Sequence, residues 1–184
     1  MNHTEKTQLR RSIKNMRLML SESERAIASK AIFDRLEQTA QFMMATRILM
    51  YHALPDEVDT RVFLDKWSSH KQFFLPRVNG VNLEILPYDR SRLELGSFHI
   101  EEPTGDDLTD PSTLELIIVP AVAYDRRGNR LGRGKGYYDR LLCETDACKV
   151  GVAYEFQVLE EIPAEPHDVP VNIVITDAGT YLTS

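Results

Sequence analysis

The N-terminal part of the chain has apolar side chains every three or four positions, the period of an amphipathic helix. The pattern predicts a helix over residues 4–20. Its apolar stripe consists of Leu9, Ile13, Met16 and Leu20. Ser21 and Glu24 then have the spacing of a capping box, so a second helix is expected from there to about residue 39. Its expected buried side chains are Ile27, Ile32 and Leu36.

Short apolar runs and helical patterns alternate in the rest of the chain. The expected strands cover residues 47–51, 116–119, 150–154 and 171–176. A helix is expected over residues 59–69, with buried Val62, Phe63 and Trp67. Apolar segments flank Asn79 and Gly80, a dipeptide that favours the left-handed turn of a β-hairpin. Several strands are apolar on both faces, so we expect an α/β fold with a mostly parallel sheet, covered on both sides, and one hairpin.

Length and charge limit the class of protein. A chain of 184 residues can bury a full hydrophobic core, and we expect one domain over residues 1–184. The N-terminus is polar and no apolar run approaches about 18 residues, so we expect neither a signal peptide nor a membrane span, and the cytoplasm is the default location. The net charge of −6 argues against a general nucleic-acid binder.

Covalent catalysis and a cysteine metal site find no support in the sequence. Cys143 and Cys148 lack the spacing of a zinc or redox pair, and we expect both to be structural residues at helix ends. No Ser-His-Asp or Cys-His arrangement is evident. The chemistry of the chain must therefore come from other residues.

The segment from Pro120 to Arg140 contains the most informative pattern in the chain. It leaves an apolar strand, crosses a loop with glycines and cations, and enters a helix that starts with two tyrosines and an aspartate. Glycines let backbone N–H groups approach a phosphate, and cations neutralise its charge. Gly136 follows Lys135 where a Walker A loop has Ser or Thr, and the glycine spacing is not that of a dinucleotide fingerprint. The segment predicts a polyanion site, with a purely structural glycine turn as the alternative.

Two loops are expected to meet at one site, because ligands of open α/β sheets collect at the carboxyl ends of the strands. They comprise residues 51–57 and 123–139. The first helix also has a basic stripe, which on its own is more typical of a solvated face. This stripe consists of Lys6, Arg10, Lys14 and Arg17.

The sequence Arg-Leu-Gly-Arg-Gly-Lys-Gly-Tyr-Tyr-Asp at residues 130–139 closely resembles the signature of the 5-formyltetrahydrofolate cyclo-ligase family, also called methenyltetrahydrofolate synthetases. Supporting matches are the basic first helix, the turn at Glu57, residues 96–103 and His167-Asp168. The resemblance covers nearly the whole chain and implies a single-domain, three-layer α/β/α fold of Rossmann-like type. It also implies ATP-dependent conversion of 5-formyltetrahydrofolate to 5,10-methenyltetrahydrofolate, with release of ADP and phosphate.

The resemblance implies an ATP site around the glycine-rich segment and the first helix. Its residues would be Lys6, Arg10, Arg130, Leu131, Gly132, Arg133, Gly134, Lys135, Gly136, Tyr137 and Tyr138. Arg133 and Lys135 would take part in catalysis, because phosphoryl transfer depends on positioning and charge neutralisation. Lys14 and Arg17 keep the interpretation of a solvated face.

The implied folate site centres on Glu57, whose carboxylate can accept hydrogen bonds from pterin N–H donors. Asp59 and Thr60 are expected to cap the helix that follows. Tyr137 and Tyr138 would line the place where nucleotide and folate meet, or simply pack. His52 is either a pocket residue or a structural histidine.

The implied cofactor is Mg²⁺, bound together with ATP. Asp139 is the expected ligand, with an ordinary acidic residue at a helix start as the alternative. Asn172 stands where the family usually has an aspartate, and it offers a carbonyl oxygen but no charge, which leaves this second contact open. We expect a monomer whose partners are ATP and 5-formyltetrahydrofolate, with no nucleic acid or membrane.

Two other functions stay open at this point. A non-catalytic folate or nucleotide sensor could keep the fold without turnover, and Asn172 is the feature that favours it. An ATP-dependent phosphotransferase could act on a different acceptor, although the turn at Glu57 argues against that.

Overall fold

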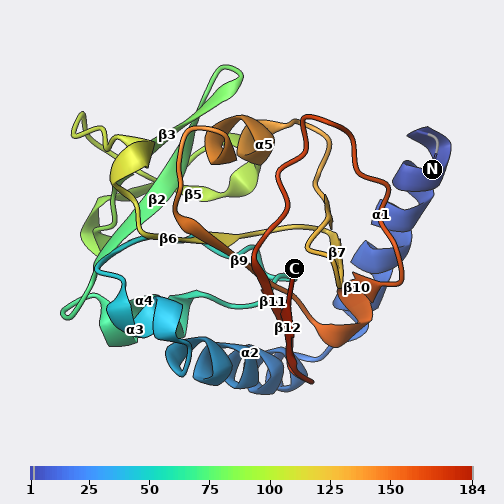
Figure 1. Ribbon diagram of the computed structural model, residues 1–184. Coiled ribbons are helices and arrows are strands. Elements are labelled where there is room, and N and C mark those ends of the chain that lie inside the picture. The colour runs from blue at the N-terminus through green and yellow to red at the C-terminus, as the bar shows by residue number, and fades with distance from the viewer. Residues whose placement is uncertain (2, 184) are drawn as a thin grey trace.

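The computed structural model describes residues 1 and 3–183 (Figure 1). The chain begins with two long helices, α1 (His3–Met19) and α2 (Glu22–Glu37). The predicted capping box between them is confirmed, because the Ser21 side chain accepts from Glu24 N and the Glu24 carboxylate accepts from Ser21 N. The short α3 (Ala40–Met44) follows and was not predicted.

The main sheet has seven strands in the order β12-β11-β9-β6-β1-β2-β3. They are β1 (Arg47–Leu49), β2 (Gln72–Asn79), β3 (Asn82–Pro87), β6 (Leu116–Val119), β9 (Cys148–Val152), β11 (Ile173–Ile175) and β12 (Thr180–Leu182). Neighbouring strands are parallel except at the two edges. The predicted hairpin at Asn79 and Gly80 is confirmed as β2–β3, with Gly80 at a φ of 62°. The antiparallel β12 at the other edge was missed.

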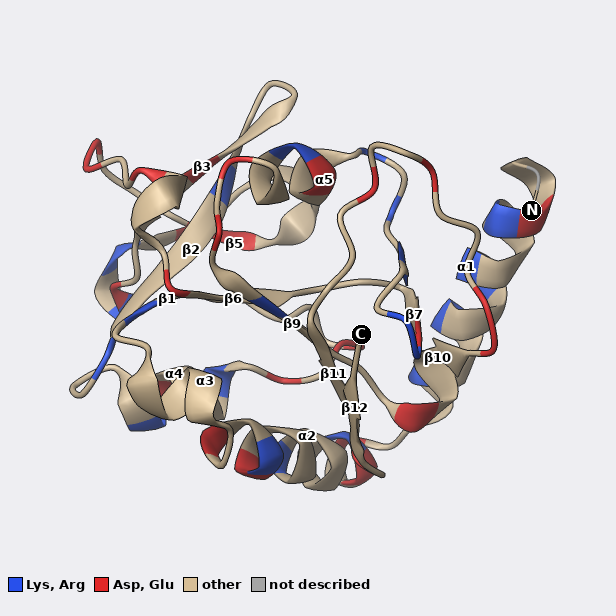
Figure 2. Cartoon of the chain, in the orientation of Figure 1, with Lys and Arg blue, Asp and Glu red and all other residues tan. Residues whose placement is uncertain are grey.

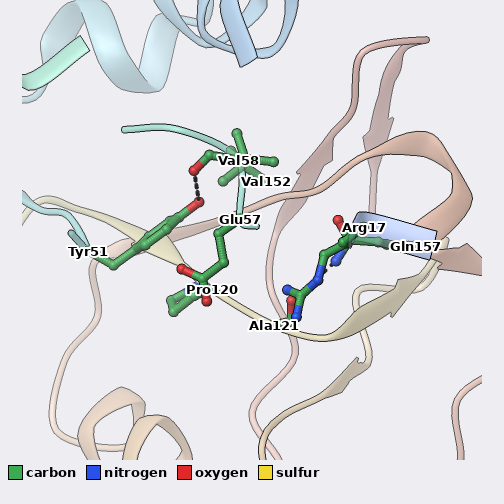
Figure 3. A pocket seen from close by; sticks show the side chains of 8 residues that line it. All are labelled: Arg17, Tyr51, Glu57, Val58, Pro120, Ala121, Val152 and Gln157. Atoms are coloured by element: carbon green, nitrogen blue, oxygen red, sulfur yellow. Dashed lines mark hydrogen bonds between the residues drawn. The ribbon is translucent and has the colours of Figure 1, made fainter. Parts of the chain in front are cut away.

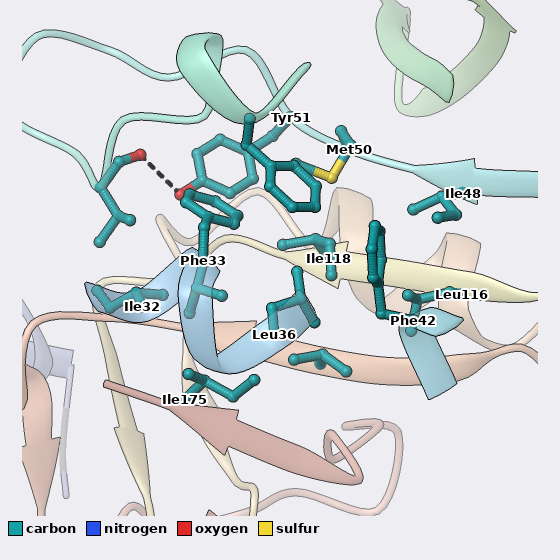
Figure 4. Packing of buried hydrophobic residues seen from close by; sticks show 14 of the residues in the cluster. Ile32, Phe33, Leu36, Phe42, Ile48, Met50, Tyr51, Leu116, Ile118 and Ile175 are labelled. Carbon is teal, nitrogen blue, oxygen red and sulfur yellow. Dashed lines mark hydrogen bonds between the residues drawn. The ribbon is translucent and has the colours of Figure 1, made fainter. Parts of the chain in front are cut away.

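Apolar side chains cover both faces of this sheet. On one face, residues such as Ile48 and Ile118 pack against α2, α3 and α4 (Arg61–Trp67) (Figure 4). On the other face, Ile117 and Val119 lie in a cluster with Leu141 of α5 (Tyr137–Leu142). Figure 1 shows α2, α3 and α4 on the side of the sheet opposite α5. A strand buried on both sides must be apolar at every position, which explains why β6 has the sequence Leu-Ile-Ile-Val.

Two small sheets and four short 3₁₀ helices complete the fold. The sheets contain β7 (Ala123–Asp125), β8 (Arg130–Leu131) and β10 (Val158–Leu159) in one, and β4 (Leu93–Leu95) and β5 (Glu101–Pro103) in the other. The 3₁₀ helices are η1 (Arg90–Arg92), η2 (Ser97–His99), η3 (Pro111–Thr113) and η4 (Glu155–Gln157). Ile13 of α1 packs in a third apolar cluster with Ala123 and Leu131, so α1 lies against the three-stranded sheet. This packing holds the basic first helix beside the glycine-rich segment.

Several expectations about burial and element ends were wrong. Ile27 and Val62 are 72% and 75% exposed. The buried positions of α2 are Ser29, Ile32, Phe33 and Leu36. Ile27 lies about 200° around the helix from Ser29, because each residue turns the helix by about 100°.

The ends of two other elements also differ from the sequence prediction. The helix expected over residues 59–69 spans only Arg61–Trp67, and the last predicted strand is shortened to Ile173–Ile175. Cys143 caps the end of α5 as expected, whereas Cys148 begins β9 instead of ending a helix. No helix in the described part of the chain is long and apolar enough to cross a membrane.

Candidate active site

The chain leaves β1 and β6 in opposite directions across the sheet. β1 is followed by β2 on one side, whereas β6 is followed by β9 on the other. Such a change of direction opens a crevice at the carboxyl ends of the two strands. The structure brings the two predicted loops together there, because Arg133 forms an ion pair with Glu57. A small pocket at this place is lined by Arg17, Tyr51, Glu57, Val58, Pro120, Ala121, Val152 and Gln157 (Figure 3).

Glu57 projects from a tight turn that is anchored on several sides. Glu57 N donates to Leu54 O at 3.0 Å, and Leu54 N donates to Glu57 Oε2 at 3.1 Å. The Tyr154 hydroxyl donates to Glu57 O at 3.0 Å, and burial raises the pKa of Tyr154 to about 12, so it stays protonated at neutral pH. Asp56 makes an ion pair with Arg17 at 3.0 Å. These bonds hold the Glu57 carboxylate in one place.

Arg17 is buried, contrary to the expected solvated face. The side chains of Arg17 and Asp56 are only 8% and 16% exposed, and Arg17 Nε has no hydrogen-bond partner in the described part of the protein. Arg17 follows the buried Ile13 by four residues, so both lie on the face of α1 that packs inward. The four-residue spacing from Ile13 was therefore a signal in the sequence that Arg17 faces inward. Lys14 is exposed, as expected.

Asp59 and Thr60 have different local roles. Asp59 Oδ1 accepts from Arg61 N at 2.9 Å, which is a capping contact at the start of α4. The Thr60 side chain makes no capping bond. Its hydroxyl donates to Tyr51 O at 2.7 Å and accepts from Ala53 N at 3.2 Å, which fixes the chain as it leaves β1.

The glycine-rich segment is more structured than the predicted loop. It forms β7, a turn and β8 before it reaches the glycines that precede α5. The fully buried Asp125 carboxylate holds this turn, because it accepts from the backbone N–H groups of Arg127 and Asn129 and from the Asn129 side chain at 2.9–3.0 Å. Asp125 also accepts from Ile162 N at 2.9 Å, which ties the segment to a distant loop. Sequence reasoning missed this residue.

The loop from Gly132 to Gly136 has backbone donors available for a ligand. None of its N–H groups donates to another group among residues 1 and 3–183. Gly134 and Gly136 have φ values of 95° and 68°, a region that side chains disfavour. Arg10 Nε donates to Gly132 O at 2.9 Å, so the basic helix touches this loop. Figure 2 shows Lys and Arg segments on α1 and on the chain between β7 and α5.

Most of the cations predicted for the ATP site have carboxylate partners within the protein. Arg133 pairs with Glu57, and the nearly buried Arg130 pairs with Asp139. Lys6 Nζ lies 3.2 Å from Glu165 Oε1. Lys135 has no carboxylate partner within the described residues, and its Nζ lies 6.0 Å from the centre of the Phe98 ring.

The two predicted metal ligands have different surroundings. Asp139 lies in the first turn of α5 and is held by Arg130, with Val169 N at 3.5 Å. Asn172 lies at the amino end of β11, where its side-chain Oδ1 accepts from Lys149 N at 2.8 Å. The Asn172 carbonyl is thus used to join two strands, which gives a metal role no support. Residues 1 and 3–183 contain no group of three or more His, Cys, Asp or Glu side chains that could hold a metal.

The predicted folate-site residues are only partly gathered around Glu57. His52 Nε2 lies 3.3 Å from Glu101 Oε2, and burial lowers the pKa of His52 despite this carboxylate. The Tyr137 hydroxyl donates to Gly80 O at 3.3 Å, which fastens α5 to the tip of the β2–β3 hairpin. Tyr138 packs against the second apolar cluster, and burial raises the pKa of its hydroxyl. Packing is therefore a clear role for Tyr138.

Phe98 lies in the segment 96–103 that supports the family resemblance, but the sequence prediction gave it no role in the site. Phe98 and His99 have φ values of 60° and 58°, in the left-handed region that non-glycine residues rarely adopt. Backbone strain of this kind clusters at functional sites. The Phe98 ring is 51% exposed and faces Lys135. No local sequence pattern predicts a left-handed phenylalanine, so only the structure reveals it.

Comparison with known proteins agrees with the signature at residues 130–139. Residues 2–177 match the 5-formyltetrahydrofolate cyclo-ligase family. The chain is 33% identical over 149 residues to the 5-formyltetrahydrofolate cyclo-ligase of Escherichia coli (strain K12), covering 76% of this chain and 82% of that protein. It is 30% identical over 184 residues to the Mus musculus protein of the same name, covering 91% of each. The NMR structure of Aquifex aeolicus 5,10-methenyltetrahydrofolate synthetase matches with a TM-score of 0.86 and 35% identity, covering 96% of this chain and 92% of that one.

Proposed function

The chain belongs to the 5-formyltetrahydrofolate cyclo-ligase family, and we propose that it converts 5-formyltetrahydrofolate to 5,10-methenyltetrahydrofolate while ATP is cleaved to ADP and phosphate. The observation that carries this proposal is the contact between Glu57 and Arg133. It joins the loop suited to a pterin with the loop suited to a triphosphate. Two substrates bound to these loops would meet at the carboxyl ends of β1 and β6.

The loop from Gly132 to Gly136 supports the ATP part of the proposal. Its backbone N–H groups donate to no group among the described residues, and such groups in a glycine-rich loop can bind phosphate. Arg10, Arg133 and Lys135 lie on or against this loop and would neutralise phosphate charge. Lys6 lies on the same helix as Arg10, and Arg130 is mostly occupied with Asp139.

Glu57 supports the folate part of the proposal. Its carboxylate lines the pocket at the end of β1, and the turn around it is rigidly anchored. A carboxylate held in this way can accept two hydrogen bonds from adjacent pterin donors. The Tyr137 ring and the exposed Phe98 ring are flat apolar surfaces near the glycine-rich loop.

The proposed reaction begins with transfer of the γ-phosphoryl group of ATP to the formyl oxygen, because a formamide oxygen is a poor leaving group. The product of this step is ADP and an iminium phosphate. N10 of the folate then attacks the formyl carbon and loses its proton to solvent, and the C–O bond breaks as phosphate departs. Arg133 and Lys135 would stabilise the charge on the transferred group, and Glu57 would orient the pterin.

Asp139 is the residue that fits Mg²⁺, as a single carboxylate near the glycine-rich loop. Mg²⁺ is usually bound by one or two carboxylates together with substrate phosphates and water, and when bound it neutralises phosphate charge. We expect Asp139→Asn to raise the Mg²⁺ concentration needed for half-maximal activity. Asn172→Asp should leave that concentration unchanged, because the side chain is used between β9 and β11.

We also propose that the fold is a three-layer α/β/α arrangement of Rossmann-like type. The helices on both faces of the sheet support a three-layer α/β/α, Rossmann-like description. A single domain, a monomeric state, a cytoplasmic location and the absence of nucleic-acid or membrane partners stay predictions from the sequence.

The test of this function is an assay with ATP, Mg²⁺ and 5-formyltetrahydrofolate that follows the absorbance of the methenyl product and the release of phosphate. We expect both products in equal amounts, and none when ATP is omitted. Binding of both substrates without product would instead favour the sensor, and phosphate release without methenyl product would favour a different phosphotransferase. Arg127→Ala is a matched control for variants of the predicted ATP-site cations, because Arg127 is a largely exposed cation outside the loop from Gly132 to Gly136.

A further inference from the structure

Arg133 belongs to both candidate subsites at once. By sequence it lies between Gly132 and Gly134, in the middle of the loop that has free backbone donors. By contact it pairs with Glu57, the carboxylate on the opposite loop. The Arg133 side chain is 46% exposed and the Glu57 side chain only 12% exposed. The arginine is therefore the partner that is free to move, and the glutamate is the partner that is held.

A triphosphate and Glu57 would compete for the same guanidinium. Arginine binds carboxylates and phosphates with the same forked set of donors, so it cannot satisfy both fully at one time. Glu57 in turn has one oxygen on Arg133 and the other on Leu54 N. While Arg133 occupies Glu57 Oε1, that oxygen has less capacity to accept a hydrogen bond from a pterin.

We propose that Arg133 couples the binding of the two substrates, because nucleotide phosphates draw it away from Glu57 and so release the carboxylate for the pterin. This inference rests on the proposed function, in which Glu57 binds the folate and the glycine-rich loop binds ATP. Nucleotide then increases the affinity for 5-formyltetrahydrofolate. By linkage, 5-formyltetrahydrofolate increases the affinity for nucleotide by the same factor.

The expected size of the coupling follows from the exposure of the pair. Couplings between sites typically lie between about fivefold and 150-fold, and exposed ion pairs contribute at the low end. The Arg133 side chain is nearly half exposed, which lowers the expected factor below that range, whereas the Glu57 side chain is mostly buried, which raises it, so we expect a factor of about three to ten.

Lys135 is the matched control within the same loop. It is a cation two residues from Arg133, but it has no carboxylate partner in the described part of the chain. Its removal should weaken nucleotide binding without changing the competition for Glu57. A coupling caused by general attraction between loop cations and phosphates would be reduced in both variants, whereas the proposed coupling depends on Arg133.

The experiment measures the dissociation constant of 5-formyltetrahydrofolate by calorimetry, with and without a saturating non-hydrolysable ATP analogue and Mg²⁺. In the wild type the analogue should tighten folate binding by about three- to tenfold. In Arg133→Met the ratio should fall to about one, and folate binding without nucleotide should be at least as tight as in the wild type. Arg133→Lys should give an intermediate ratio, and Lys135→Met should keep the wild-type ratio at saturating analogue.

Several results would overturn the coupling and leave the proposed function standing. They are a wild-type ratio of about one, an unchanged ratio in Arg133→Met, or loss of folate binding in Arg133→Met without nucleotide. A wild-type protein that binds neither 5-formyltetrahydrofolate nor the ATP analogue would contradict the proposed function as well.

Discussion

The two loops that meet at the candidate active site are held in opposite ways. The turn around Glu57 is fastened by hydrogen bonds from Leu54 and Tyr154 and by the ion pair between Asp56 and Arg17. The loop from Gly132 to Gly136 contains glycines with positive φ and backbone N–H groups that donate to no other protein group within the described residues. The first loop offers a fixed acceptor, and the second offers donors and cations that can close around an anion.

This difference fits the two kinds of substrate proposed for the site. A flat pterin is recognised by acceptors and donors at set positions, so a preorganised carboxylate suits it. A triphosphate is flexible and highly charged, and the protein needs many donors and cations to surround it. We therefore expect substitutions in the glycine-rich loop to lower activity most. Substitutions in the anchored turn around Glu57 should instead lower stability or folate binding.

The largest expected effect is on ATP use. Arg133→Ala and Lys135→Ala should each lower kcat/KM for ATP by about 30- to 1000-fold, which corresponds to about 2–4 kcal/mol of transition-state stabilisation. The thermal midpoint should change little in Lys135→Ala, because Lys135 is exposed and has no carboxylate partner among the described residues. Arg133→Ala should also lower the midpoint, because it leaves the mostly buried Glu57 carboxylate without its cation. Steady-state assays at limiting ATP measure the effect, with Arg127→Ala as the control. Normal turnover in both variants would show that the glycine-rich loop is not part of the ATP site.

The next effect tests how the anchored turn is held. Arg17→Met leaves the mostly buried Asp56 carboxylate without its cation and should lower the free energy of unfolding by about 3 kcal/mol, the low end for a buried pair because Asp56 is still 16% exposed. Arg17→Met combined with Asp56→Leu should recover most of this loss, because no unpaired charge remains. Urea unfolding measures both variants.

A control for the Arg17 variant is available in the same region. Arg61 pairs with Asp59 at 2.6 Å, but the Arg61 side chain is largely exposed, so Arg61→Met should cost no more than about 1 kcal/mol. If Arg17→Met were as mild as Arg61→Met, the ion pair with Asp56 would not anchor the turn.

Arg17 also illustrates what could and could not be predicted from the sequence. Local patterns were sufficient for the capping box at Ser21, the hairpin at Gly80 and the strand at residues 116–119, since each depends on neighbours in the chain. The spacing of Arg17 from Ile13 indicated that this cation turns inward, but its pairing with Asp56 joins residues far apart in the sequence and has no local signal.

The candidate site was predicted with the same division between local and long-range features. The glycines and cations of residues 130–139 were evident, because their chemistry is written in one short segment. The partners of the site cations were not, because Glu57 and Glu165 lie far in sequence from Arg133 and Lys6. The pairing of Arg130 with Asp139 depends on how the loop between β8 and α5 is folded. The contact of Asn172 with Lys149 could not be predicted for a similar reason, because it depends on the register of β9 and β11.

A smaller effect is expected from removing the charge of the fixed acceptor. Glu57→Gln keeps the shape of the side chain but replaces one acceptor oxygen by a donor, so it should raise the KM for 5-formyltetrahydrofolate by about tenfold, or about 1.4 kcal/mol. The KM for ATP should stay level or fall, because Arg133 no longer has an anionic competitor. Titration of each substrate at saturating concentration of the other measures the two constants. An equal rise in both would assign Glu57 to the scaffold instead.

The smallest effect concerns pH and again separates the two regions. His52 follows β1 on the anchored side, and burial lowers its pKa below the ordinary value of 6.5, an effect that the nearby Glu101 carboxylate only partly opposes. Below pH 6.5 the unfolded chain therefore binds a proton at His52 more readily than the folded protein does. The stability that comes from this histidine is complete above that pH and is lost as the pH falls toward its lowered pKa. Urea midpoints between about pH 5 and pH 8 should decline less steeply toward acid in His52→Gln than in the wild type. An identical decline in both proteins would show that His52 does not contribute to the acid sensitivity of the anchored region.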